Sequence, residues 1–149
     1  MQKKIIVAIL VSALFISLIP PSGYCQTSDK KFELLKLELN DEGVSDEFIY
    51  IVRNATKKMI ASAAATVDIK IVLLDLWGQK VEGRALKNAV AAVAELVESG
   101  DNVLEAASIA STAAHKAESE GLSGFGVGMR VRKAVQDRKV YLRSLKNNI

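Results

Sequence analysis

The chain is poor in the residues that build metal centres and disulfide frameworks. Among its 149 residues it has one histidine and one cysteine, which are His115 and Cys25. A structural zinc site needs four converging ligands, mostly Cys and His, and a disulfide needs two cysteines. The sequence therefore predicts neither a metal site nor a disulfide. A fold without these supports depends on its apolar core, which is built from aliphatic residues and alanine because aromatic residues make up only 5% of the chain.

Residue patterns typical of catalytic sites are scarce as well. His115 stands on a predicted helix, and no Gly-x-Ser-x-Gly motif accompanies it. Glu95 and Glu98 have the spacing of paired carboxylates on one helix face, but exposed acids on most amphipathic helices share that spacing. The glycine-rich residues 121–128 lack the Lys-Ser or Lys-Thr pair of a phosphate-binding loop. We therefore expect a non-enzymatic protein that holds no cofactor.

The N-terminus has the pattern of a secretory signal peptide. Lys3 and Lys4 precede an uncharged apolar run, residues 5–19, which ends at two prolines. A helix needs roughly 20 apolar residues to cross a bilayer, so this run is short for a permanent anchor. Gly23 and Cys25 supply small side chains at the two positions that signal peptidase requires, and cleavage after Cys25 fits best.

Residues 1–25 are thus predicted to be a signal peptide, and we expect an exported protein, periplasmic or extracellular. A lipoprotein signal is the alternative, because it also ends at a cysteine, which becomes acylated. Tyr24 argues against lipidation of Cys25, since the lipoprotein enzymes require a small residue before the cysteine.

Charge divides the remaining chain into two parts. Residues 26–120 carry 11 Lys or Arg against 16 Asp or Glu, whereas residues 121–149 carry seven against one. The sequence therefore predicts an acidic helical body over 26–120, a glycine-rich joint over 121–128 and a basic amphipathic helix over 129–149.

Hydrophobic periodicity predicts an all-α fold, a small antiparallel bundle of four or five helices. Ser45 and Asn102 are suited to cap two of these helices. The stretch 66–74 is ambiguous, because its β-branched residues alternate with charged ones as in a short strand, but no partner strand is evident. The predicted helices cover 29–39, 45–77, 84–98, 102–120 and 129–145.

The basic C-terminal helix is the main candidate for a binding site. Its cations suit anionic lipid headgroups or an acidic protein face. The alternative is that this helix folds back onto the acidic body. Nucleic acid is not expected, because the protein is predicted to be exported and the helix after Ser45 opens with two acidic residues, which a phosphate backbone would repel. The predicted anionic-surface residues are Arg130, Arg132, Lys133, Arg138, Lys139, Arg143 and Lys146.

These features together favour an exported, non-enzymatic helical protein that interacts with a partner, or has a structural role, in a bacterial cell envelope. The alternative is a protein that binds anionic membrane surfaces through the basic C-terminal helix. Helix faces rich in alanine also make self-association a hypothesis.

Overall fold

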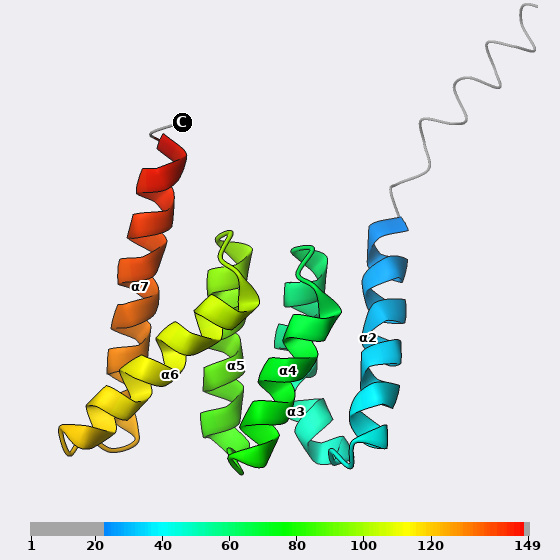
Figure 1. Ribbon diagram of the computed structural model, residues 1–149, viewed down its shortest axis with the longest axis horizontal. Coiled ribbons are helices and arrows are strands. Elements are labelled where there is room, and N and C mark those ends of the chain that lie inside the picture. Colours follow the sequence, from blue (N-terminus) through cyan, green and yellow to red (C-terminus); the bar gives the residue numbers. More distant parts are fainter. Residues whose placement is uncertain (1–22, 148–149) are drawn as a thin grey trace, which may run out of the picture.

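The computed structural model describes residues 23–147, and every regular element within that range is an α-helix (Figure 1). The all-α bundle is confirmed, with six helices in this range instead of four or five. The predicted signal peptide lies outside the described residues except for its last three, which begin the first of these helices. In chain order the helices are α2 (Gly23–Asp41), α3 (Asp46–Ala61), α4 (Thr66–Gly78), α5 (Gly83–Glu98), α6 (Val103–Ser119) and α7 (Phe125–Asn147).

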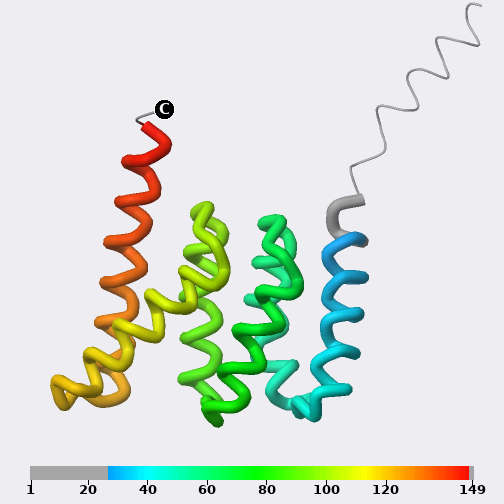
Figure 2. Tube along the Cα trace, viewed as in Figure 1, coloured from blue at the N-terminus to red at the C-terminus, as the bar shows by residue number. Residues whose placement is uncertain are grey.

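The helices are stacked in two layers. Helices α2, α4 and α6 follow one another in one layer, and α3, α5 and α7 follow one another in the other, each in contact with the next. Across the layers, α3 contacts α2 and α4, while α6 contacts α5 and α7. Figures 1 and 2 show α4 and α6 crossing in front of α3 and α5. Helical-repeat proteins have this arrangement, in which each helix pair buries its apolar face against its neighbours.

The sequence of the second helix pair repeats the first at an offset of 37 positions, a periodicity that becomes clear from the buried residues. Phe32 on α2 corresponds to Ile69 on α4, and Ile49 on α3 corresponds to Leu86 on α5. Helix α6 has 17 residues against 13 in α4, so the third pair contains one extra helical turn. Further buried pairs at the same offset are Thr56 and Val93, Met59 and Leu96, and Ile60 and Val97.

Helices α2 to α6 all end in the same hydrogen-bonded turn. At the end of α2, the Val44 N–H donates to the Leu39 carbonyl at 3.0 Å and the Gly43 N–H donates to the Asn40 carbonyl at 2.9 Å. This Schellman arrangement satisfies two free carbonyls and requires one residue with positive φ. That residue is Gly43, Ala63, Lys80, Gly100 and Gly121 in the five successive turns.

The prediction of one helix over 45–77 is wrong, because residues 62–65 separate α3 from α4. Ala63 adopts φ 62° there, although an alanine gives no stop signal in the sequence. An unbroken helix would be about 50 Å long and would carry its second half past the core. The turn instead brings Ile69 and Leu73 of α4 into the core, where both are fully buried. Helix is confirmed over strand at 66–74.

The glycine-rich segment is a shorter joint than predicted. Gly121 and Gly124 have positive φ values of 79° and 41°, but Gly126 and Gly128 are helical, because α7 begins at Phe125. Glycine weakens an isolated helix, yet packing of α7 along α6 supplies the stability that the local sequence lacks. A Cβ at position 126 would lie 3.2 Å from the Leu122 Cβ, so the backbone at Gly126 lies close to the Leu122 side chain.

Both predicted helix caps are confirmed. The Ser45 Oγ accepts a hydrogen bond from the Phe48 N–H at 3.2 Å, and the Asn102 Oδ1 accepts one from the Leu104 N–H at 2.8 Å. Each satisfies a backbone donor at the start of its helix. These caps set where α3 and α6 begin, and hence where the chain turns back into the stack.

Candidate functional site

Helix α7 contains the predicted basic site, and it packs against α5 and α6. Four of its cations contact an acidic side chain or a backbone carbonyl, namely Arg130, Arg138, Lys139 and Lys146. The other three are exposed and form no ion pair with any described residue, namely Arg132, Lys133 and Arg143. The fold therefore uses part of the basic helix to hold it onto the acidic body.

Arg138 makes the most extensive of these contacts. Its Nε lies 2.8 Å from Asp101 Oδ2, and its Nη2 lies 2.8 Å from Asp101 Oδ1. The same Nη2 donates to Glu105 Oε2 at 2.5 Å. A two-bond arginine–carboxylate pair is among the stronger polar contacts, because the planar guanidinium matches both carboxylate oxygens.

The Arg138 contact is largely removed from water. The Asp101 side chain is 3% exposed and that of Arg138 is 23% exposed. Hydrogen bonding to Asp101 is the main cause that raises the pKa of Arg138 above its ordinary value, and desolvation opposes it. Arg138 also lies 5.2 Å from the centre of the Tyr141 ring, in a cation–π contact.

Arg138 occupies a position that is apolar in the preceding helix pair of the repeat. Arg138 is 16 positions after Leu122, the residue that follows the positive-φ glycine of the preceding turn, and Val97 is 16 positions after the equivalent Val81. Asp101 likewise corresponds to Ala64, 37 positions earlier. Thus the last helix pair has a charged pair where the preceding one has the apolar residues Ala64 and Val97.

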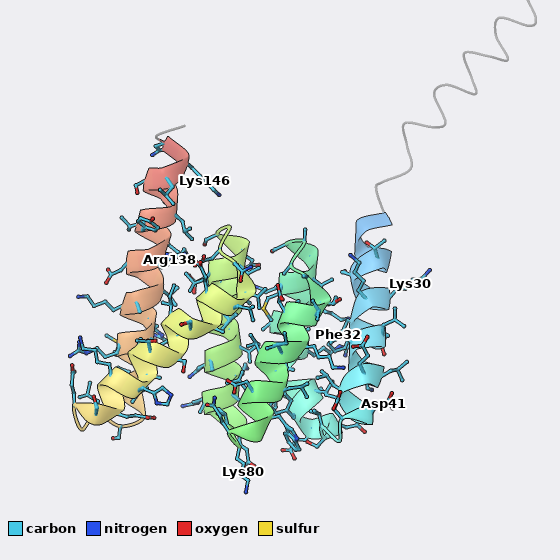
Figure 3. All side chains as sticks on the ribbon, in the orientation of Figure 1. Lys30, Phe32, Asp41, Lys80, Arg138 and Lys146 are labelled. Carbon is cyan, nitrogen blue, oxygen red and sulfur yellow. The ribbon has the colours of Figure 1, made fainter. Side chains whose placement is uncertain are left out.

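Weaker polar contacts extend along α7 on both sides of Arg138. Lys139 Nζ lies 2.6 Å from Glu95 Oε1 on α5, and Arg130 Nη2 lies 2.6 Å from Glu120 Oε2. Lys146 Nζ donates to the Ser99 carbonyl at 3.4 Å, near the end of α5. Figure 3 shows Arg138 and Lys146 on the side of α7 that faces α5.

The opposite side of α7, here called the α7 outward face, combines apolar and basic residues. Phe125, Met129 and Val140 are 83%, 51% and 64% exposed. They recur at helical spacing with the unpaired cations, so all lie on one face. The α7 outward face consists of Phe125, Met129, Arg132, Lys133, Gln136, Val140 and Arg143, and the exposed Asp137 lies beside it, one turn after Lys133.

The residues considered for catalysis do not gather at one place. His115 is exposed on α6, with its Nδ1 3.7 Å from Glu118 Oε2. Glu95 is bound by Lys139 of α7, whereas Glu98 lies 3.6 Å from Lys58 Nζ of α3. The two glutamates therefore join α5 to different helices instead of facing a shared cleft.

Two surface hollows lie between the described helices. One, of about 480 Å³, lies between α2 and α3 and is lined by both acidic and basic side chains, including Glu33, Glu47 and Arg53. The other, of about 280 Å³, lies between the turn at 62–65 and residues 100–103, and its lining includes Ala64, Val97 and Asp101. Neither hollow includes an unpaired cation of α7.

Neither a metal-ligand cluster nor a membrane-spanning helix occurs among residues 23–147. Within them, no cluster of three or more His, Cys, Asp or Glu is placed to hold a metal ion. No helix in the same range has both the length and the apolar character needed to cross a bilayer. Comparison with protein-family models, with curated proteins and with solved structures finds no match.

Proposed function

We propose that this chain is an exported, non-enzymatic helical protein that interacts with a partner, or has a structural role, in the bacterial cell envelope. The observation that carries the proposal is the apolar character of both ends of the stack. Leu34 and Leu37 on α2 are 62% and 61% exposed, and Phe125 and Val140 on α7 are exposed to a similar or greater extent. The outer faces of terminal repeats are normally polar, because nothing covers them.

Exposed apolar groups on terminal helices support binding in preference to catalysis. Large apolar side chains that remain in water usually mark a surface that a partner covers. In addition, several charged residues of the α5–α7 region are engaged in holding helices together, as Arg138 and Asp101 illustrate. The predicted leader adds the expectation that the partner is met outside the cytoplasm.

Site-specific photo-cross-linking in cells that export the protein tests this proposal. A photo-reactive amino acid in place of Val140 should give a discrete adduct of higher mass in the envelope fraction. The same group in place of Asn88, which is exposed on α5, is the matched control and should give none. Equal adducts at both positions, or recovery of the protein from the cytoplasm, would contradict the proposal.

The second candidate function is binding to an anionic membrane surface, and the α7 outward face supports it. Arg132, Lys133 and Arg143 have no ion pair with described residues and stand beside exposed Phe125 and Val140. Basic and apolar side chains on one helix face suit the boundary between lipid headgroups and acyl chains. The other four basic residues of α7 are engaged with the body, which limits the available charge.

Co-sedimentation with vesicles that contain an anionic phospholipid separates the two candidates. If the membrane is the target, replacing all three unpaired cations by glutamine should weaken binding at low salt by about a hundredfold. Replacing Lys80, Arg84 and Lys87, which are exposed and also lack ion pairs among the described residues, is the control with the same charge change. Equal losses in both variants, or no sedimentation of the unmodified protein, would exclude the membrane-binding function.

A further inference from the structure

The outer side of α2 carries a stripe of four residues that is complementary to itself. Lys30, Leu34, Leu37 and Asp41 follow at steps of four, three and four, the spacing of a helix–helix seam. All four are exposed. Lys30 and Asp41 lie on the side of α2 away from the other helices, whereas Phe32 points toward them (Figure 3). This set of four residues is the α2 outer stripe.

The order of residues along the α2 outer stripe determines what can pack on it. A cation stands at one end, an anion at the other and two leucines between them. If a second α2 lies antiparallel across the stripe, Lys30 faces Asp41 of the other copy and Leu34 faces Leu37. A parallel arrangement would instead place each charge against its own like charge, which is repulsive.

From this complementarity we infer that two copies of the chain form a symmetric dimer through antiparallel contact of their α2 outer stripes. The dimer rests on the proposed interaction function, because it names the partner for one end of the stack. A two-fold axis between Leu34 and Leu37 generates both ion pairs and both leucine contacts. Such isologous contacts are the commonest way in which soluble proteins form dimers.

The two helices that contact α2 also carry exposed apolar residues. Tyr50 on α3 is 77% exposed, and Val67 and Ile71 on α4 are 63% and 51% exposed. Helix α2 contacts both α3 and α4. Two of the charged groups beside the stripe are engaged within the chain, since Glu38 pairs with Lys70 and Lys36 lies 3.9 Å from Asp46. Lys30 and Asp41 have no such pair among the described residues, so they are available to a second copy.

The other end of the stack does not have this self-complementarity. The α7 outward face has three unpaired cations against one neighbouring acid, Asp137, so two copies of it would bring an excess of like charge together and repel each other. The dimer therefore leaves both α7 outward faces uncovered, and each remains available to another partner.

Charge reversal tests the antiparallel geometry. The full chain, recovered from a host that exports it, should be a dimer by light scattering and analytical ultracentrifugation. K30E and D41K should each weaken the dimer by about tenfold, because each places like charges together at both ends. The double variant K30E/D41K, and an equimolar mixture of the two single variants, should restore the affinity. L34E should weaken the dimer by about a hundredfold, since it buries a charge against leucine.

K87E and D137K carry the same charge changes at exposed positions away from α2, and they should leave the dimer unchanged. Circular dichroism checks that each variant keeps its helix content. A monomeric mass for the unmodified chain at high concentration would overturn the inference while leaving the Val140 cross-linking test unaffected. A dimer that persists in L34E, or one that K30E/D41K does not restore, would also overturn it.

Discussion

Arg138 on α7 and Asp101 in the turn between α5 and α6 form a two-bond ion pair that holds the last helix onto the stack, with N–O distances of 2.8 Å. The pair brings together a cation of the basic C-terminal segment and an anion of the acidic body. The basic helix thus folds back onto the acidic body through part of its charge. Four of its cations contact the body, namely Arg130, Arg138, Lys139 and Lys146, and the other three are exposed. The cations on one side of α7 therefore hold the helix in place, and those on the other side remain exposed.

Replacing Arg138 by alanine should lower the free energy of unfolding by about 2–3 kcal/mol, because it leaves the 3%-exposed Asp101 carboxylate without its partner. This estimate is below the range for fully buried pairs, since the Arg138 side chain is 23% exposed. Urea denaturation measures the change. R132A removes an exposed, unpaired cation of the same helix and should change stability by less than about 0.5 kcal/mol.

The repeat suggests how stability can be restored. Asp101→Ala with Arg138→Val reproduces the Ala64 and Val97 pair of the preceding repeat, and the double variant should unfold within about 1 kcal/mol of the unmodified protein. If the double variant is as unstable as R138A alone, the two positions are not equivalent in the repeat.

Ala63 and Lys80 occupy the positive-φ positions of two helix-ending turns, with φ 62° and 55°, where the other three turns have glycine. A side chain in this conformation costs about 1 kcal/mol, so A63G should raise the free energy of unfolding by about 0.5–1 kcal/mol. A61G makes the same substitution at the last residue of α3 and should lower stability. Thermal unfolding of both variants checks that the two changes in the free energy of unfolding have opposite signs. Destabilisation by A63G would contradict the turn assignment.

Thr56 is fully buried, and its hydroxyl has no hydrogen-bond partner among the described residues. The equivalent position in the next repeat is Val93. Thr56→Val removes the unsatisfied hydroxyl at nearly constant shape and should stabilise the protein by about 1 kcal/mol. T112V on the exposed side of α6 is the control and should have little effect. A lower midpoint for T56V in chemical denaturation would indicate that the hydroxyl is satisfied in solution.

Lys70 links α4 to α2 through Glu38 and Glu42, at 3.3 and 3.4 Å. Hydrogen bonding to Glu38 is the main cause that raises the pKa of Lys70 above 10.5, and Glu42 adds to the effect against desolvation. The folded chain therefore holds this proton more tightly than the unfolded chain does. Its contribution to stability should be fully present below about pH 9.5 and lost as the pH rises through the raised pKa.

Comparing unfolding of K70Q with that of the unmodified protein at several pH values tests the Lys70 contribution. The difference between them should be constant from pH 7 to about pH 9.5 and should shrink above that. K87Q, which removes an exposed lysine without an ion pair among the described residues, should show no such trend. A difference that already declines between pH 7 and pH 9 would contradict the assignment.

Most helices could be predicted from the sequence because their signals are local. Apolar residues at steps of three and four, together with caps such as Ser45 and Asn102, depend only on neighbours within one or two turns. The long predicted helix over 45–77 failed for the same reason. Nothing local marks Ala63 as a turn, and only packing of Ile69 and Leu73 on the core makes that turn favourable.

The candidate site shows the same limit. The sequence identified all seven cations of the C-terminal helix, and their charge needs no structure to be recognised. It did not separate paired from unpaired cations, because that depends on which of them face Glu95, Asp101 and Glu120. The spacing of the α2 outer stripe was also present in the sequence, but its exposure became evident only once Phe32 and Leu35 occupied the core.

By itself, the sequence determined that the chain is helical, that an acidic part precedes a basic one, and the bounds of α5 and α6 to within one residue. These properties follow from backbone hydrogen bonding within each helix, from side-chain periodicity and from formal charge, all of which act locally or can be counted. Tertiary structure alone decided the break at Ala63, the two-layer stacking of the repeat and the pairing of Arg138 with Asp101. Those outcomes depend on contacts between residues far apart in the chain, and such contacts exist only when the helices bury a common core.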